Sequence, residues 1–165
     1  MCLPPSRYIS RTIIDMAELT IRRMSDDDLD IVEQLEKVSL KAPWNKEVLY
    51  SDLHDNPCSV ILIAEMDGRV AGYLDFMITF DSATISRIAV FPEYRRNGIA
   101  RALLNEMNDI CKKQEDPVAW ITLEVRPSNE NAVNLYLSSG YEKVTIKKAY
   151  YDDGEDAIYM MRSLL

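Results

Sequence analysis

Three runs rich in aliphatic residues follow one another between residues 59 and 91, and they constrain the fold more than any other feature of this sequence. The first two, residues 59–65 and 69–80, are separated by Asp67-Gly68, a dipeptide that favours a tight hairpin. Asp81-Ser82 then turns the chain into a third run over residues 83–91. The three runs are therefore predicted to form an antiparallel meander.

Four helical patterns surround the meander. Ser25, followed by three aspartates, is typical of a helix N-cap with an acidic first turn. Asn45 and Ser128 are expected to cap two further helices, and Gly140 is expected to end the second of these. The fourth pattern places apolar residues at helical spacing from Leu103 to Cys111.

Further strands are predicted over residues 19–22, 118–125, 141–151 and 157–161. The order β α α β β β α β α β β then predicts an α/β fold with a mixed, mostly antiparallel sheet of about seven strands and four helices on both faces. The length of 165 residues fits one domain over residues 18–165. Residues 1–17 show no sustained period and are expected to form a tail.

The charge balance excludes some classes of partner. With 19 basic and 27 acidic residues the net charge is −8, which argues against a whole-domain grip on nucleic acid. No apolar stretch approaches the roughly 20 residues of a membrane-spanning helix. The N-terminal residues also lack the apolar region of a secretory signal, so the expected location is cytoplasmic.

The chain offers few residues for metal or nucleophilic chemistry. Cys2, Cys58 and Cys111 are odd in number and never in Cys-x-x-Cys spacing, which argues against a zinc site and a disulfide framework. His54 is the only histidine, which disfavours catalytic triads that need one. Proton transfer is therefore expected to use a carboxylate, a tyrosine or water.

A basic, glycine-containing segment, Arg95 to Arg101, lies where the third strand of the meander gives way to a helix. A helix N-terminus offers unpaired N–H groups, and Gly98 allows close approach to the backbone, so the segment suits an anion. No Gly-Lys-Ser/Thr follows, and only one glycine is present, which excludes a Walker loop and a dinucleotide fingerprint. On spacing alone, an ordinary basic loop fits equally well.

The longer segment from Ser86 to Leu104 resembles the acetyl-CoA motif of the GNAT superfamily of N-acetyltransferases, and the order of elements is also the order of that family. The resemblance implies an acetyl-CoA cofactor, released as CoA. Backbone amides of Ile88, Ala89 and Val90 would hold its pantetheine. The residues implied for its pyrophosphate are Arg95, Arg96, Asn97, Gly98, Ile99 and Ala100.

Three later segments, residues 123–129, 132–141 and 150–157, are similar to RimI-type and other protein N-terminal acetyltransferases. This similarity implies that Glu124 is the general base, that Tyr136 is the general acid and that Asn129 contacts the cofactor. Without this similarity, Glu124 also fits the role of a solvated residue on a strand, and Tyr136 also fits the role of an aromatic residue packed in a helix. The amine must lose a proton before it attacks, and the departing thiolate must gain one. Glu124 would accept the first proton, and Tyr136 would donate the second.

The same resemblance implies that the acceptor peptide is gripped by the bend between the first two helices and by the loop joining the last two strands. Pro43 and Trp44 occupy the bend, and Tyr150 and Tyr151 occupy the loop. Simple packing is the alternative role for these aromatic residues. Trp44 stands where the catalytic subunit of the similar eukaryotic N-terminal acetyltransferases has a glutamate. Substrate preferences that depend on that carboxylate are therefore not expected here.

The sequence therefore predicts a metal-free enzyme that moves acetyl from acetyl-CoA to a protein N-terminal α-amine by direct attack in a ternary complex. Ribosomal proteins are the leading class of acceptor through the RimI resemblance. A GNAT enzyme acting on lysine side chains, polyamines or other small amines is the first alternative. A noncatalytic acyl-CoA-sensing module is the second. The oligomeric state and any auxiliary subunit are left open.

Overall fold

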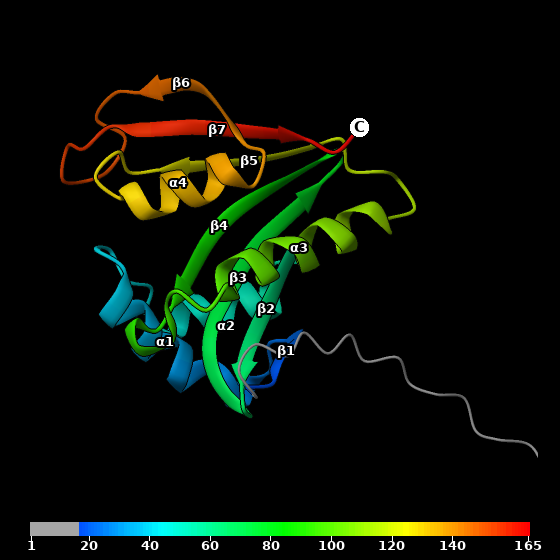
Figure 1. The fold of residues 1–165 in the computed structure, drawn as a ribbon, viewed down its shortest axis with the longest axis vertical. Coiled ribbons are helices and arrows are strands. Elements are labelled where there is room, and N and C mark those ends of the chain that lie inside the picture. The colour runs from blue at the N-terminus through cyan, green and yellow to red at the C-terminus, as the bar shows by residue number, and fades with distance from the viewer. Residues whose placement is uncertain (1–16) are drawn as a thin grey trace, which may run out of the picture.

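The computed structural model describes residues 17–165, so the predicted tail lies outside the described residues except for its last position. One seven-stranded sheet organises the chain, in the order β1-β2-β3-β4-β5-β7-β6 (Figure 1). The strands are β1 (Leu19–Arg23), β2 (Ser59–Met66), β3 (Arg69–Thr79), β4 (Ser82–Val90), β5 (Trp120–Val125), β6 (Glu142–Lys147) and β7 (Ala157–Ser163). The predicted fold class and the meander of β2, β3 and β4 are confirmed.

The four helices are α1 (Leu29–Ser39), α2 (Lys46–Asp55), α3 (Ile99–Lys112) and α4 (Glu130–Ser138). Two short 3-10 turns, Asp26–Asp28 and Pro92–Tyr94, precede α1 and α3. Asn45 caps α2 as predicted, because its side chain accepts the N–H of Val48 at 3.0 Å. The predicted cap of α4 was wrong by one residue.

Asn129, not Ser128, begins α4, since its Oδ1 accepts the N–H of Ala132 at 3.2 Å. The sixth strand is also shorter than predicted and ends at Lys147. Ala149 adopts a left-handed φ of 47°, which extended strand backbone does not tolerate, so the chain leaves the sheet before Tyr150. Both tyrosines predicted for the acceptor site therefore lie in a loop.

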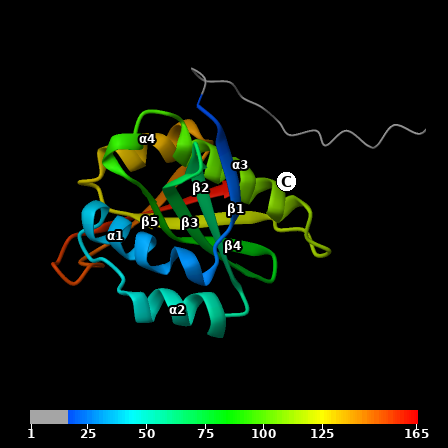
Figure 2. The same ribbon diagram turned by 90° about the horizontal axis from the view of Figure 1, so that it is seen from below.

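Two apolar cores lie on opposite faces of the sheet, as Figure 2 shows with α1 and α2 on one side and α3 and α4 on the other. The larger core packs Leu103, Leu104 and Met107 of α3 against the sheet. The smaller core buries Val32 and Leu35 of α1. None of the helices within residues 17–165 combines the length and the apolar character that crossing a membrane requires.

The pairing of β4 with β5 positions the site. It is the only parallel pair in the order of the sheet, and it covers three register positions, from Ser82↔Trp120 to Thr84↔Thr122. Beyond Thr84 the two strands diverge, as the green and yellow strands show in Figure 1. The strands therefore splay apart in the middle of the sheet.

Candidate active site

The splay leaves one edge of β4 without a strand partner. Ile88, Ala89 and Val90 pair only with β3, on the side away from β5. The register also shifts between Asp75 and Phe76, so Ser86 of β4 has no opposite residue and forms a bulge. Backbone groups on the free edge can then bind an extended ligand in place of a strand. This is the edge predicted to hold pantetheine.

The start of α3 lies at the end of this edge and lacks a side-chain cap, whereas α2 and α4 have asparagine caps. Gly98, with φ 74°, precedes the helix, and the bond from Ala102 N–H to the Gly98 carbonyl is 3.0 Å long. The N–H groups before Ala102 have no carbonyl within the helix to bind. A fourteen-residue helix with such an open start suits the anionic pyrophosphate.

Of the other residues predicted for the pyrophosphate, Arg95, Arg96 and Asn97 lie in an exposed loop, whereas the buried Ile99 and the partly buried Ala100 form the first residues of α3. Two of the loop residues shape the loop. Arg95 donates from Nε to the Val90 carbonyl at 3.0 Å, and Asn97 donates to the Tyr94 carbonyl at 2.9 Å. Arg96 has a left-handed φ of 66°. The loop, the open helix start and the free strand edge together fit an acetyl-CoA molecule laid along β4 and across the start of α3.

Glu124 lies on β5, on the face opposite the buried Leu123 and Val125, as its position in the alternating strand predicted. The Lys147 ammonium of β6 donates a hydrogen bond to the Glu124 carboxylate. The same ammonium lies 4.7 Å from the ring centre of Tyr159 and 5.3 Å from that of Tyr150. The bond to Glu124 raises the pKa of Lys147, which therefore stays charged.

Tyr136 projects from α4 into the larger core, where it is 4% exposed and packs edge-on against Tyr141 at 5.4 Å. Burial, followed by the nearby Tyr141 and Tyr151 hydroxyls, holds the pKa of Tyr136 well above its usual range. The phenol is therefore a protonated donor at neutral pH. Burial also raises the pKa of Tyr151, against an opposing effect of Arg126 and with smaller contributions from Tyr150 and Glu124.

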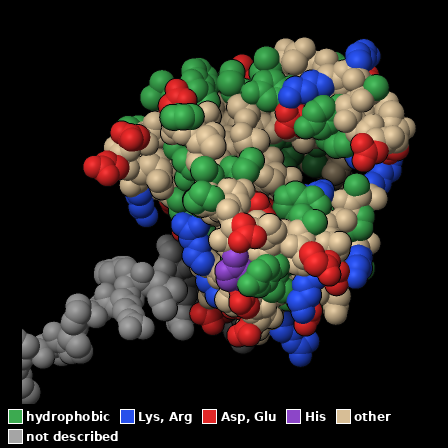
Figure 3. All heavy atoms as spheres, turned by 180° about the vertical axis from the view of Figure 1, so that it is seen from behind, with side chains coloured by type: hydrophobic (Ala, Val, Ile, Leu, Met, Phe, Trp, Pro, Cys, Tyr) green, Lys and Arg blue, Asp and Glu red, His purple; other side chains and the backbone are tan. Residues whose placement is uncertain are grey.

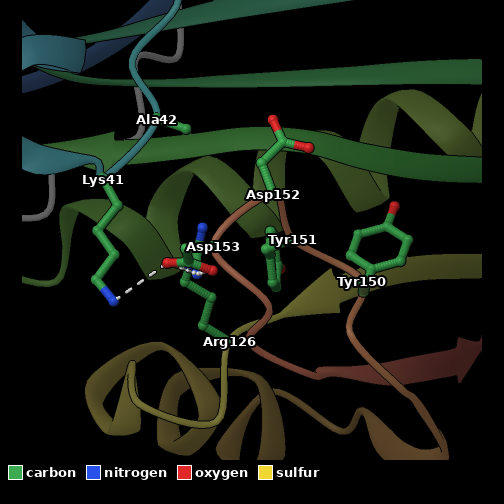
Figure 4. Close-up of a pocket in the computed structure, with 7 residues that line it drawn as sticks. All are labelled: Lys41, Ala42, Arg126, Tyr150, Tyr151, Asp152 and Asp153. Atoms are coloured by element: carbon green, nitrogen blue, oxygen red, sulfur yellow. Dashed lines mark hydrogen bonds and ion pairs between the residues drawn. The ribbon is translucent and has the colours of Figure 1, made fainter.

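Three of the four residues predicted for the acceptor line pockets: Tyr150 and Tyr151 line one, and Trp44 lines another. Tyr150 and Tyr151 lie opposite Lys41 and Ala42 of the α1–α2 connection around a pocket of about 380 Å³ (Figure 4). Figure 3 shows that the back of the molecule is hollowed. Trp44 does not line this pocket but a second one of about 340 Å³ beside α2. Pro43 lies between Ala42 and Trp44 in the chain and is exposed.

An ion-pair network at the side of the first pocket was not found from the sequence. Arg126 donates to Asp153 at 2.9 Å and to Glu155 at 2.8 Å, and its guanidinium lies 3.8 Å from the ring centre of Tyr151. Lys41 reaches Glu155 from the α1–α2 connection at 3.4 Å. Hydrogen bonding to Ser128, chiefly to its side chain, and then to Arg126 lowers the pKa of Glu155 to about 2. The acidic run after Tyr151 was the only sequence signal.

A buried carboxylate of α1 holds the α1–α2 connection through a backbone hydrogen bond. Like the ion-pair network, it was not predicted from the sequence. Glu36 is fully buried and accepts the backbone N–H of Trp44 at 2.8 Å. The Tyr73 hydroxyl donates to the same carboxylate. Glu36 lies eight residues before Trp44, and no spacing along the chain marks it as the partner of Trp44.

The fold and the site together define an acyl-CoA-dependent transferase, and comparison with known proteins makes the class explicit. The model of the Acetyltransferase (GNAT) family matches residues 29–141, so this chain belongs to the GNAT family. It is an N-acetyltransferase that uses acetyl-CoA.

More particular relatives are RimI and archaeal enzymes. The chain is 34% identical to the ribosomal protein bS18-alanine N-acetyltransferase of Escherichia coli K12, over 86% of this chain and 95% of that protein. It is 32% identical to an N-alpha-acetyltransferase of Saccharolobus solfataricus, over 89% and 94%. The crystal structure of the Escherichia coli ribosomal-protein-S18-alanine N-acetyltransferase superposes with a TM-score of 0.79, covering 88% of this chain and 94% of the other.

Proposed function

We propose that this enzyme acetylates the N-terminal α-amine of proteins, with ribosomal proteins as the leading acceptors. The observation that carries the proposal is the pocket between the α1–α2 connection and the β6–β7 loop, on the side of the sheet toward which Glu124 points. Lys147 contacts both Glu124 and the ring of Tyr150, so one side chain separates the proposed base from the pocket. Two of the relatives are named for alanine or α-amine acetylation.

Proton transfers are assigned to two residues in this proposal. Glu124 takes a proton from the acceptor ammonium, directly or through water. The α-amine has a pKa of about 7.7–8.0, against about 10.4 for lysine, so a carboxylate is a sufficient base. Tyr136, kept protonated by burial, donates a proton to the departing sulfur. As the new C–N bond replaces the C–S bond, the acceptor nitrogen loses its second proton, which passes through water to restore the Tyr136 phenol. No covalent bond to the enzyme is needed.

Binding and orientation are assigned to the rest of the site. Acetyl-CoA supplies an activated acetyl thioester. The free edge of β4 at Ile88, Ala89 and Val90 aligns its pantetheine, and the open start of α3 binds its pyrophosphate. Asn129 caps α4 beside β5, which is compatible with its proposed contact to the cofactor. Proximity and polarisation of the carbonyl by backbone N–H groups then supply most of the rate enhancement.

A peptide-library acetylation assay read by mass spectrometry tests this function. Peptides with a free N-terminus and no lysine should be acetylated at the α-amine, and the same peptides with blocked N-termini should not react. Lysine-containing blocked peptides and a polyamine form the other arms. If only the blocked lysine peptides or the polyamine were acetylated, the proposal would be wrong, and the acceptor would be a lysine side chain or a small amine.

A further inference from the structure

Arg87 reaches from the strand that borders the acetyl-CoA site to the segment that borders the acceptor pocket. It lies on β4, directly after the bulge at Ser86 and directly before Ile88. Its Nη2 donates to the backbone carbonyl of Ala42 at 3.1 Å. Its guanidinium carbon lies 4.4 Å from the centre of the Trp44 ring. One side chain therefore holds two points of the α1–α2 connection.

Those two points belong to the proposed acceptor side of the site. Ala42 lines the pocket opposite Tyr150, as Figure 4 shows, and Trp44 lines the neighbouring pocket. The backbone of Trp44 is held separately by Glu36. Glu36 thus anchors the Trp44 backbone from α1, while Arg87 anchors its ring and the Ala42 carbonyl from β4. Without Arg87, the Ala42 carbonyl loses its hydrogen bond to β4, and the Trp44 ring loses its contact with the guanidinium.

The surroundings of Arg87 favour this attachment. Asp75 is its register partner on β3, yet no ion pair joins them, and Asp75 Oδ2 and Arg87 Nε are both buried without a partner in the described chain. Burial, with the nearby Asp52 carboxyl, raises the pKa of Asp75 to about 8, so its carboxyl is uncharged at neutral pH. Arg87 opposes this rise, yet its guanidinium contacts Ala42 and Trp44 on the acceptor side and forms no ion pair with Asp75.

We propose that Arg87 is a positioning residue for the acceptor: it holds Ala42 and Trp44 against β4 and thereby sets the acceptor pocket, without contacting acetyl-CoA. The proposal rests on the peptide acceptor proposed above. An arginine suits the task because its flat guanidinium stacks on an aromatic ring while its N–H groups bind a carbonyl. Lysine can keep the charge but not both contacts.

The kinetic test separates the two substrates. Arg87→Met should raise the KM for a free-N-terminus peptide by about tenfold, the size expected when a cation–π contact and a charged hydrogen bond are lost together. The KM for acetyl-CoA should change by less than about twofold, since the proposal assigns Arg87 no contact with it. Arg87→Lys should give an intermediate peptide KM.

A matched control separates positioning from general destabilisation. Arg22 is a half-buried arginine of β1 that pairs with Asp28, in the 3-10 turn before α1, and with Glu65 of β2, and it lines neither pocket. Arg22→Met should lower the melting temperature at least as much as Arg87→Met and leave the peptide KM unchanged. A peptide KM that follows melting temperature in both variants, or an acetyl-CoA KM that rises in Arg87→Met, would overturn the proposal.

A spectroscopic readout keeps the test independent of the acceptor. In a Trp120→Phe background, Trp44 is the remaining tryptophan. Arg87→Met should shift its emission and increase its quenching by iodide, because the ring loses its cover. Unchanged Trp44 fluorescence would refute the positioning role. If the fluorescence changes but free-N-terminus peptides are not substrates of the parent enzyme, the acceptor assignment fails and the contact role of Arg87 stands.

Discussion

At the scale of residues, Glu124 and Tyr136 project from consecutive elements of the chain, β5 and α4. Glu124→Gln and Tyr136→Phe should each lower kcat about a hundredfold, within the range of general acid–base catalysis. Calorimetry should find acetyl-CoA binding retained. Glu142→Gln, an exposed change on β6, is the control. Full activity in both site variants would favour a role without catalysis by these groups.

Lys147 forms an ion pair with Glu124, and in the proposed mechanism it competes there with the acceptor ammonium. Lys147→Met should therefore lower the peptide KM by about two- to fivefold, the scale of one partly exposed ion pair. Steady-state kinetics with a fixed, saturating acetyl-CoA concentration provide the measurement. Lys148→Met is the matched control, because that lysine pairs with Asp156 and not with Glu124. A raised KM in Lys147→Met alone would mean that the lysine assists binding.

Asp75 makes stability depend on pH. Its pKa is about 8 in the fold and about 4 in an unfolded chain, so the native state holds an extra proton between these values. The free energy of unfolding should fall as pH rises from about 4 to 8 and lose no more from this group above 8. Asp75→Asn should reduce the difference between pH 5 and pH 8 by about 1–3 kcal/mol in urea titrations. An unchanged difference would mean that Asp75 is ionised throughout.

At the scale of elements, most boundaries follow from local rules, and the site contacts do not. The Asn45 cap and the Asp67-Gly68 hairpin depend on neighbouring residues, so the sequence predicted them. The Lys147–Glu124 pair depends on β7 lying between β5 and β6, with Lys147 reaching across it. Spacing along the chain carries no information about that strand order. The family resemblance predicted which loops meet, but not the ion pairs between them.

Close packing of β3, β4 and α3 depends on Gly72. A Cβ at this position would lie 2.8 Å from the Ala89 carbonyl oxygen and 3.3 Å from Ile99. Gly72→Ala should lower the free energy of unfolding by about 1–3 kcal/mol, as overpacking does. It should also weaken acetyl-CoA binding, because Ala89 and Ile99 belong to the proposed cofactor site. Calorimetry and denaturant titration measure the two effects, and stability unaffected by the alanine would contradict the close approach.

At the scale of the whole molecule, the two faces of the sheet carry different parts of the proposed site. One face, under α3 and α4, buries Tyr136, while the other carries Glu124 and the two pockets. Between these faces β4 and β5 splay apart, since they share no register position beyond Thr84 and Thr122. Acetyl donor and acceptor can therefore approach from different sides and meet at β5, which is what direct transfer in a ternary complex requires.

The net charge of −8 acts on the acceptor before any contact forms. A peptide with basic residues behind its first positions should be attracted at low ionic strength, where the Debye length is about 30 Å at 0.01 M, and less so at 0.15 M, where it is about 8 Å. We expect kcat/KM for such a peptide to fall severalfold between these salt concentrations, and that for a neutral peptide with the same first two residues to stay constant. Because the pocket itself pairs Lys41 and Arg126 with Asp153 and Glu155, the attraction comes from the molecule as a whole. Equal salt dependence for the two peptides would mean that only contacts in the pocket select the acceptor, and that the net negative charge of the molecule does not contribute.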